Sequence, residues 1–379
     1  MKISIGRPSF GKEELKVMGD VLRSQWILNG PKVLEFENKF RERTGAEFAA
    51  SVTSCTAGMH LALAALNVEG GEVILPAFNF IGAGLAVLQA GAKPVFADVD
   101  SMTYTIDPKE IEKKITGKTR AIFVLHYAGL PADMDPILEI AAKYKIPVVE
   151  DAAHALGAEY KDRKVGTMGK ATIFSFGPVK AITTGMGGMI TTSDKSLDNN
   201  LRVLRSYGMN RSAWGRRNSN KPWRYQVNQL GHNFRMTEIS AALGLVQLDR
   251  LGNFLSKRRK LSSLFTKTLS SIPGVTPPKE PIDYLHAFLY YVVRINKRSF
   301  GISRDSLAKR LIDLGIGVSV HWDPPLHLHN IFKKFGYKKT DFKVSERLSR
   351  ELLTLPMHPK LTYKDIGFIV ECIKGHGRA

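Results

Sequence analysis

The chain has 379 residues, of which 44% are hydrophobic and 24% charged, and its formal net charge is +20. This length suits two domains, and this composition is typical of a globular protein, which excludes a disordered or fibrous chain. The apolar stretch 81–92 is shorter than the roughly 20 residues that cross a bilayer, and the N-terminus lacks the apolar core of a signal peptide. Two cysteines give no disulfide framework. We therefore expect a soluble cytoplasmic enzyme without membrane insertion.

The excess of positive charge, 55 Lys and Arg against 35 Asp and Glu, predicts an anionic partner. The basic residues are spread along the chain, with one local concentration at 202–224. The sequence has no zinc-finger spacing, RNA-binding signature or basic zipper, which argues against nucleic acid as the partner. A phosphorylated small molecule is the expected anion.

From residue 72 onward, short apolar runs alternate with segments of helical periodicity. They predict strands at 72–76, 94–99, 121–127, 147–151, 172–176 and 187–193, and helices at 80–90, 107–115 and 135–144. This alternation is typical of an α/β fold with a mostly parallel sheet that helices cover on both faces. Ligands bind beyond the carboxyl ends of the strands in such sheets, where His126, Asp151 and Ser175 lie.

The pattern changes after a long helical stretch at 237–269. Beyond it, the sequence predicts strands at 287–295 and 317–322, a helix at 303–315 and two C-terminal helices. We therefore predict a large domain over 1–250, which includes an N-terminal arm at 1–30, and a smaller α/β domain over 251–379.

Two segments of the large domain carry candidate binding groups. In 53–61, small hydroxyl residues precede a helix, where free N–H groups and the hydroxyls of Ser54 or Thr56 can hold a phosphate or simply cap the helix. In 148–154, Asp151 ends a buried strand and needs a cation or a donor as its partner. A protonated pyridine nitrogen meets that need, and so does capping of the next helix.

A third segment, 174–189, places Lys180 in an apolar loop that is rich in glycine. Desolvation makes a lysine amine nucleophilic, as Schiff-base chemistry requires. The glycines at 185, 187 and 188 let the backbone approach a ligand closely. The alternative is an ordinary lysine in a surface loop.

Together and in this order, these motifs resemble the DegT/StrS-type family of pyridoxal-phosphate (PLP) sugar aminotransferases, which have the aspartate-aminotransferase fold (fold type I). The resemblance runs from SQWILNGP at residue 24 to LPMHPKLTYKDI at residue 355, which is nearly the whole chain. Between these ends it includes EDAAHALGA, FSFGPVKAITTGMGG, GHNFRM and VHWDPPLHLH. It implies a PLP-binding homodimer with shared active sites.

The resemblance also assigns roles to residues at matching positions. Lys180 matches the lysine that holds the cofactor and moves the proton, and Asp151 matches the carboxylate paired with the pyridinium nitrogen. His154 stands at a Gln or His position that contacts the cofactor ring or its phenolic oxygen, and completes the expected catalytic set. The other expected cofactor contacts are the stacking ring of Phe80, the phosphate ligands Thr56, Ala57 and Ser175, and Asn233, which the neighbouring subunit supplies.

On the substrate side, the resemblance makes His321 a residue that contacts the sugar or the donor, with a structural histidine as the alternative. Arg216 and Arg217 lie in the basic segment and are either within reach of a diphosphate or solvated. His327 and His329 have the spacing of a metal pair, but no acidic or cysteine partner stands beside them, so we expect no metal.

Three positions depart from the family's usual pattern. Met186 stands where Glu is usual, Gln25 where Gly is usual, and Cys55 where Gly is common. Met186 removes a charge near the lysine loop, so donor recognition is the property that this change affects.

We expect the chain to move an amino group from an amino-acid donor, L-glutamate, to a keto-sugar on a nucleoside diphosphate, for glycan or secondary-metabolite biosynthesis. The net charge of +20 fits this polyanionic substrate. One alternative is a PLP-dependent sugar dehydratase or deoxygenating enzyme, and Lys180 argues against it because dehydratase relatives carry His there. The other is a non-catalytic regulatory relative, against which the intact set of Lys180, Asp151 and Ser175 argues.

Overall fold

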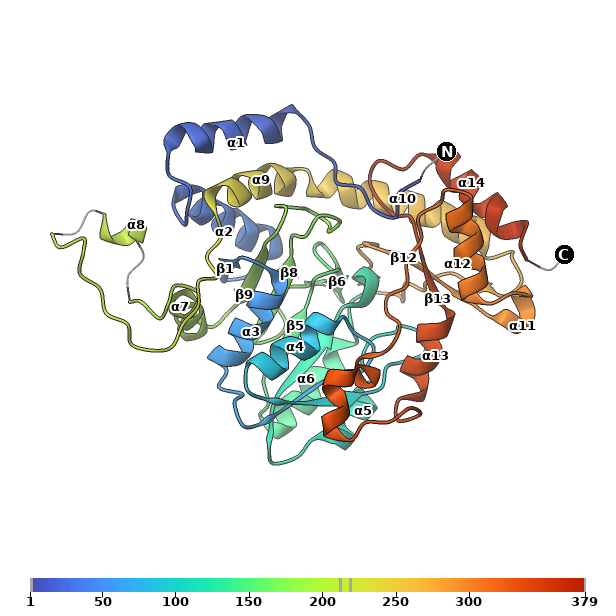
Figure 1. The fold of residues 1–379 in the computed structure, drawn as a ribbon, viewed down its shortest axis with the longest axis horizontal. Helices are drawn as coiled ribbons and strands as arrows, with labels where there is room; N and C mark the ends of the chain where they lie inside the picture. The colour runs from blue at the N-terminus through green and yellow to red at the C-terminus, as the bar shows by residue number, and fades with distance from the viewer. Residues whose placement is uncertain (1–2, 211–212, 218–219, 378–379) are drawn as a thin grey trace.

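The computed structural model describes residues 3–210, 213–217 and 220–377, apart from the side chains of Ala213 and Arg216. A seven-stranded sheet with the order β1-β9-β8-β5-β4-β2-β3 forms its centre (Figure 1). In that order, the strands are Phe48–Val52, Gly188–Thr192, Ala171–Ser175, Val148–Asp151, Thr119–Leu125, Glu72–Pro76 and Lys93–Ala97. Strand β9 is antiparallel to both of its neighbours and the other pairings are parallel, which confirms the expected mostly parallel sheet.

Helices pack on both faces of the sheet because its strands carry apolar side chains on both sides. One face packs against α3 (Cys55–Ala65), α4 (Ile81–Gln89) and α7 (Lys195–Leu204). On the other face, α2 (Pro31–Thr44) and α9 (Glu238–Asp249) cover β1, β9 and β8. Helices α5 (Pro108–Lys114) and α6 (Met134–Tyr144) cover the half of the sheet that contains β5, β4, β2 and β3. Helix α1 (Lys12–Ser24) lies outside α9 (Figure 1).

A smaller unit follows α9, on the right of Figure 1. Its core packs α10 (Leu251–Leu269), α12 (Arg304–Asp313) and α14 (Tyr363–Lys374) around a sheet of β10 (Val275–Thr276), β12 (Tyr291–Ile295) and β13 (Leu352–Leu355). The short elements are β6 (Glu159–Tyr160), β7 (Arg163–Lys164), β11 (Tyr284–Leu285), α8 (Ala213–Arg216), α11 (Lys297–Phe300), α13 (Lys343–Glu351), η1 (Tyr127–Gly129), η2 (Leu326–Leu328) and η3 (Asn330–Phe335).

Two segments of the chain cross between these units. Ile3 lies in the core of the smaller unit and pairs with Ile316. In the opposite direction, Phe332 returns to the large sheet and packs edge-on against Phe96 at 5.2 Å. The domain boundary at residue 250 stays a proposal, and these contacts mean that neither side of it is independent of the other.

Every strand and helix that the sequence predicts between residues 72 and 193 is present, with ends within two residues of the expected ones. The stretch 237–269 is helical as expected, but it divides into α9 and α10 at Arg250, whose guanidinium binds Glu14 of α1 at 2.6 Å. One later prediction is wrong. The stretch 317–322 is not a strand, because β13 occupies the place beside β12 and only Ser319 pairs with it, at Thr354.

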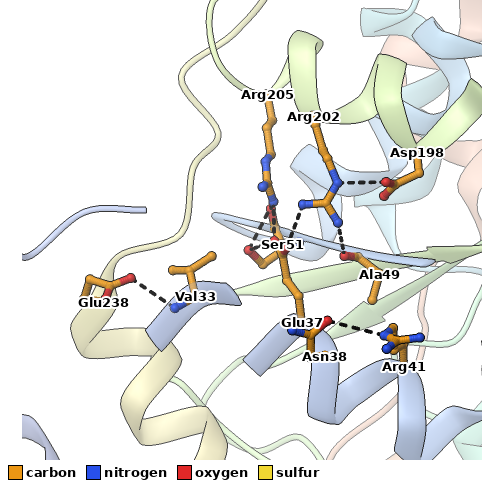
Figure 2. A network of polar contacts seen from close by, with 10 residues as sticks. All are labelled: Val33, Glu37, Asn38, Arg41, Ala49, Ser51, Asp198, Arg202, Arg205 and Glu238. Atoms are coloured by element: carbon orange, nitrogen blue, oxygen red, sulfur yellow. Dashed lines mark hydrogen bonds and ion pairs between the residues drawn. The ribbon is translucent and has the colours of Figure 1, made fainter. Parts of the chain in front are cut away.

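A buried polar network joins α2, β1 and α7 (Figure 2). Glu37 of α2 accepts hydrogen bonds from the Ser51 backbone N–H (2.9 Å) and from Arg202 (2.7 Å) and Arg205 (2.6 Å). Arg202 is also paired with Asp198 at 2.8 Å. The network fixes edge strand β1, and therefore the position at which α3 begins.

Candidate active site

A cavity of about 280 Å³ opens where the sheet faces the smaller unit. Its walls include Leu125, Asp151 and Ser175, which are the last residues of β4, β5 and β8, together with Tyr290 and Trp322 of the smaller unit. The carboxyl ends of the strands thus form a cavity, as expected for this kind of sheet. The residues proposed from the sequence that line it are Ser54, Thr56, Phe80, Asp151, His154, Ser175, Lys180 and His321.

Asp151 brings a carboxylate to this cavity from the end of β5. Its side chain is only 2% exposed, and Oδ1 accepts a hydrogen bond from the Ala153 backbone N–H at 3.0 Å. Burial raises the pKa of Asp151 to about 6, although the charge of Lys180 acts in the opposite direction. A carboxylate in this environment gains most from a cationic ligand, such as a protonated pyridine nitrogen.

The neighbouring Glu150 points to the opposite face of β5, because side chains alternate along a strand. It pairs with His126 at 2.8 Å and accepts a hydrogen bond from the Thr172 hydroxyl at 2.7 Å. Nδ1 of His126 accepts from the Ala132 backbone N–H at 3.0 Å. Both ring nitrogens of His126 are therefore used within the fold, so this histidine at a strand end does not serve the cavity.

Lys180 lies in the loop between β8 and β9, where its backbone N–H closes a turn onto the Gly177 carbonyl at 3.2 Å. Its Nζ is 5.8 Å from the centre of the Tyr290 ring. Among the described residues that line the cavity, it is the only Lys or Arg. The loop thus brings one amine into the same cavity as the Asp151 carboxylate.

Two histidines line the cavity in a neutral form. Burial, helped by the charge of Lys180, lowers the pKa of His154 well below its ordinary value and that of His321 to about 4. Nδ1 of His154 accepts a hydrogen bond from the Ala128 backbone N–H at 3.3 Å, so its remaining proton is on Nε2. Nδ1 of His321 forms a hydrogen bond of 3.0 Å with the Thr354 hydroxyl. Both rings are held in place by the backbone or by a neighbour.

The start of α3 supplies the candidate phosphate site. Ser54 caps this helix, because its Oγ accepts a hydrogen bond from the Ala57 backbone N–H at 3.1 Å. Thr56 and Ser175 line the cavity, whereas Ala57 does not, so the part of Ala57 in phosphate binding stays a prediction. Gly188 is needed here, since a Cβ would lie 2.9 Å from the Cys55 backbone nitrogen.

Two proposed residues do not line this cavity. Asn233 is exposed and accepts a hydrogen bond from Arg235 at 3.0 Å, away from the cavity of its own chain. The Arg217 guanidinium is 5.6 Å from the ring centres of both Trp26 and Trp214. The side chain of Arg216 lies outside the described part of the structure.

Sequence reasoning missed two rings that complete the cavity. Trp322 stacks on His154, with centroids 5.8 Å apart and planes 21° apart, and Tyr290 stacks on His321 at 4.4 Å and 22°. Trp322 could have been found, because it follows His321 in the VHWDPP motif. Tyr290 stands in an apolar run that reads only as a strand, so nothing in the sequence marks its ring.

The three departures from the family pattern have different settings. Gln25 ends α1 with a φ of +58°, a backbone region that favours glycine, which explains why Gly is usual there. Met186 lines the cavity and is 64% exposed. Burial and the charge of Asp151 raise the pKa of the Cys55 thiol well above its ordinary value, which disfavours the reactive thiolate form.

The residues present fit PLP, which is a flat cationic ring with an anionic tail. Asp151 suits the ring nitrogen, the start of α3 suits the phosphate, and the ring of Phe80 is 53% exposed and free to stack. Asn79 also lines the cavity: its Oδ1 accepts from the Phe80 backbone N–H at 2.6 Å, while its buried Nδ2 has no partner among the described residues. A buried donor of this kind calls for an acceptor on a ligand.

Comparison with protein families gives one match over nearly the whole chain. The model of the DegT/DnrJ/EryC1/StrS aminotransferase family matches residues 8–374. Among curated proteins, the uncharacterized protein MJ1066 of Methanocaldococcus jannaschii is 42% identical over 97% of this chain and 96% of its own length. The UDP-4-amino-4-deoxy-L-arabinose–oxoglutarate aminotransferase of Shewanella sediminis is 35% identical over 97% of this chain and 96% of its own length.

Comparison with solved structures gives the same result. The sugar aminotransferase Spr1654 of Streptococcus pneumoniae, solved with PMP bound and described as putative, superposes with a TM-score of 0.93. It is 28% identical, over 99% of this chain and 98% of its own. None of the described helices in our structure is both long and apolar enough to cross a membrane.

Proposed function

The chain belongs to the DegT/DnrJ/EryC1/StrS aminotransferase family and is a PLP-dependent aminotransferase, and from this premise we propose that it aminates a keto-sugar carried on a nucleoside diphosphate, with L-glutamate as the donor. The observation that carries the proposal is the cavity in which Lys180 and Asp151 meet beside the start of α3. The net charge of +20 supports a polyanionic substrate. The name of the Shewanella sediminis relative supports both a UDP-linked sugar and oxoglutarate, the product of glutamate.

When bound, PLP supplies a reactive aldehyde and an electron-withdrawing ring. In our proposal, Lys180 holds the cofactor, and its amine then takes the proton from the substrate carbon and returns it. The Asp151 carboxylate holds a proton on the pyridine nitrogen, and this favours the transition state more than the ground state. His154 is neutral, so its Nε2–H is available as a donor to a cofactor oxygen.

Thr56, Ala57, Ser175 and the amides at the start of α3 are the proposed phosphate ligands, and Phe80 is the ring that covers the cofactor. His321 is the proposed contact to the sugar or the donor. It stands with Trp322 on the wall of the cavity that the smaller unit forms. Arg216 and Arg217 remain candidates for the diphosphate.

We also propose that the active unit is a homodimer in which Asn233 serves the phosphate of the neighbouring chain. The segment that precedes Asn233 carries exposed apolar side chains: Trp223, Val227 and Leu230 are 74%, 58% and 88% exposed. Large apolar side chains grouped in this way favour an interface. The two free cysteines are consistent with a reducing compartment, and we propose the cytoplasm.

The test is a substrate screen with the PLP-loaded protein. It is incubated with L-glutamate and a panel of nucleoside-diphosphate keto-hexoses that differ in base and in the position of the keto group, and product masses are measured. We expect one sugar to gain an amino group and Lys180→Ala to give none. Amination of free keto-hexoses alone would contradict the nucleotide part of the proposal, and reaction with alanine but not glutamate would contradict the donor.

A further inference from the structure

The ring of Tyr290 contacts three residues that reach the cavity from three separate segments. Nζ of Lys180 lies 5.8 Å from the ring centre, within the range of a cation–π interaction. His321 stacks on the ring at 4.4 Å, and His154 meets it edge-on at 4.8 Å and 71°. The proposed cofactor lysine and the two cavity histidines therefore share one aromatic neighbour.

The backbone around Tyr290 is anchored as firmly as its ring. Its own N–H donates to the Ala128 carbonyl at 3.2 Å. Arg258, which is 3% exposed, donates to the carbonyl of Leu289 at 2.9 Å and to that of Met357 at 2.8 Å. Tyr290 is thus held beside Lys180 in two ways: by the hydrogen bonds that fix its backbone and by the contacts of its ring with His154 and His321.

The other groups that line the cavity leave the charged lysine few partners. His154 and His321 are neutral near pH 7, because burial holds the pKa of each below that range. Asp151 is the one acid among the described residues that line the cavity, and the proposed function gives it to the pyridine nitrogen. The face of the Tyr290 ring, which carries negative potential, remains to stabilise an ammonium group.

We propose that Tyr290 is a positioning residue for the proton transfer, and that its ring face holds the Lys180 amine when that amine is protonated. The inference rests on the proposed function of Lys180. In the step concerned, the C–H bond of the substrate breaks, the proton bonds to Nζ, and the electron pair passes to the bound cofactor. A cation forms on Nζ in this step, so the ring, 5.8 Å from Nζ, stabilises the protonated lysine more than the neutral one.

The contact itself is tested without activity. In cofactor-free protein with ¹³Cε-labelled lysines, the Lys180 signal, assigned with Lys180→Arg, should be shifted upfield by the ring of Tyr290. Tyr290→Phe should keep this shift and Tyr290→Leu should lose it. An unshifted Lys180 signal in the unmodified protein would overturn the proposal, whether or not glutamate is the donor.

The catalytic part is tested by replacing Tyr290 with phenylalanine that carries zero, one, two or three ring fluorines, which weakens the negative ring face and keeps the shape. With the PLP-loaded protein and L-glutamate, conversion of the cofactor should slow stepwise to about one tenth. The isotope effect with 2-deuterated glutamate should rise in parallel. A rate and an isotope effect that do not change with fluorination would overturn the proposal. If unmodified protein reacts with another amino acid instead, the donor assignment fails separately, and the same series is run with that amino acid and its 2-deuterated form.

Discussion

Glu37 and Arg205 form a buried ion pair, in which Nη1 of Arg205 lies 2.6 Å from Oε1 of Glu37 and the two side chains are 4% and 5% exposed. The pair connects α2 to the end of α7, across strand β1 (Figure 2). Burial alone would raise the pKa of Glu37, but the charges of Arg205 and Arg202 hold it at about 2. The pair matters to the cavity because α3 and its cap Ser54 follow directly from β1.

The first prediction is that Glu37→Gln lowers the free energy of unfolding at pH 7 by about 3–5 kcal/mol, because it leaves the buried Arg205 without a carboxylate, while Arg202 keeps only Asp198. The folded pKa of about 2 lies below the ordinary value of 4.5, so this stabilisation is complete above pH 4.5 and is lost as the pH falls toward 2. Urea unfolding at several pH values should show the difference shrink below pH 4.5. Glu35→Gln, at an exposed pair with Lys32, is the control and should cost less than about 1 kcal/mol. A difference independent of pH would contradict the assignment.

The second prediction concerns the cofactor lysine. Borohydride reduction of the PLP-loaded protein, followed by peptide mass mapping, should place the cofactor on Lys180. Lys180→Ala should bind PLP only reversibly and lose transamination, since no other Lys among the described residues lines the cavity. Lys170→Ala, at an exposed pair with Asp194, is the matched control and should keep the adduct. A stable adduct in Lys180→Ala would refute the role of this residue.

The third prediction is that Asp151→Asn makes the cofactor-free protein more stable and the enzyme less active. The folded pKa of about 6 lies above the ordinary 3.8, so the ionised carboxylate destabilises the fold; this penalty is absent below about pH 4 and complete above pH 6. Asp151→Asn should therefore raise the free energy of unfolding at pH 8, by up to roughly 3 kcal/mol, and leave it unchanged at pH 4. Turnover of the PLP-loaded variant should fall about a hundredfold or more. A loss of stability at pH 8 would show instead that the carboxylate serves the fold.

The sequence predicts an element or a site residue well only where its position depends on the residues next to it in the chain. The strands near Asp151, Ser175 and Lys180 were predictable because each is a short apolar run between turns, and the parallel arrangement brings their ends together. Strand β13 was missed because its four residues directly continue α13, and no turn residue separates them. The positions of Tyr290 and Trp322 were not predictable, since they depend on how the smaller unit packs over the sheet. His126 is the opposite case. It follows a strand end, where ligand-binding residues are expected, but its ring faces Glu150 and not the cavity.

The fourth prediction concerns the shared site. If Asn233 serves the neighbouring chain, Lys180→Ala and Asn233→Asp should each be nearly inactive as homodimers, the second because it sets a carboxylate against the phosphate. In a mixed dimer, one site combines an intact Lys180 with an intact Asn233 from the partner chain, and the other site carries both lesions. Each two-fold dimer has two equal sites, so a purified mixed dimer should recover about half of the unmodified activity.

Two different affinity tags on the two variants allow the mixed dimer to be isolated after partial dissociation and reassembly. The control is Gln229→Asp, at a neighbouring exposed amide whose Nε2 donates to Asn200 at 2.7 Å. This variant should still form a dimer and stay active on its own, and that result would exclude a general effect of negative charge in this segment. If each site were built from one chain, Lys180 and Asn233 would be damaged in separate chains and no site would be intact in either homodimer or mixed dimer. A pure mixed dimer without activity would therefore refute the shared site.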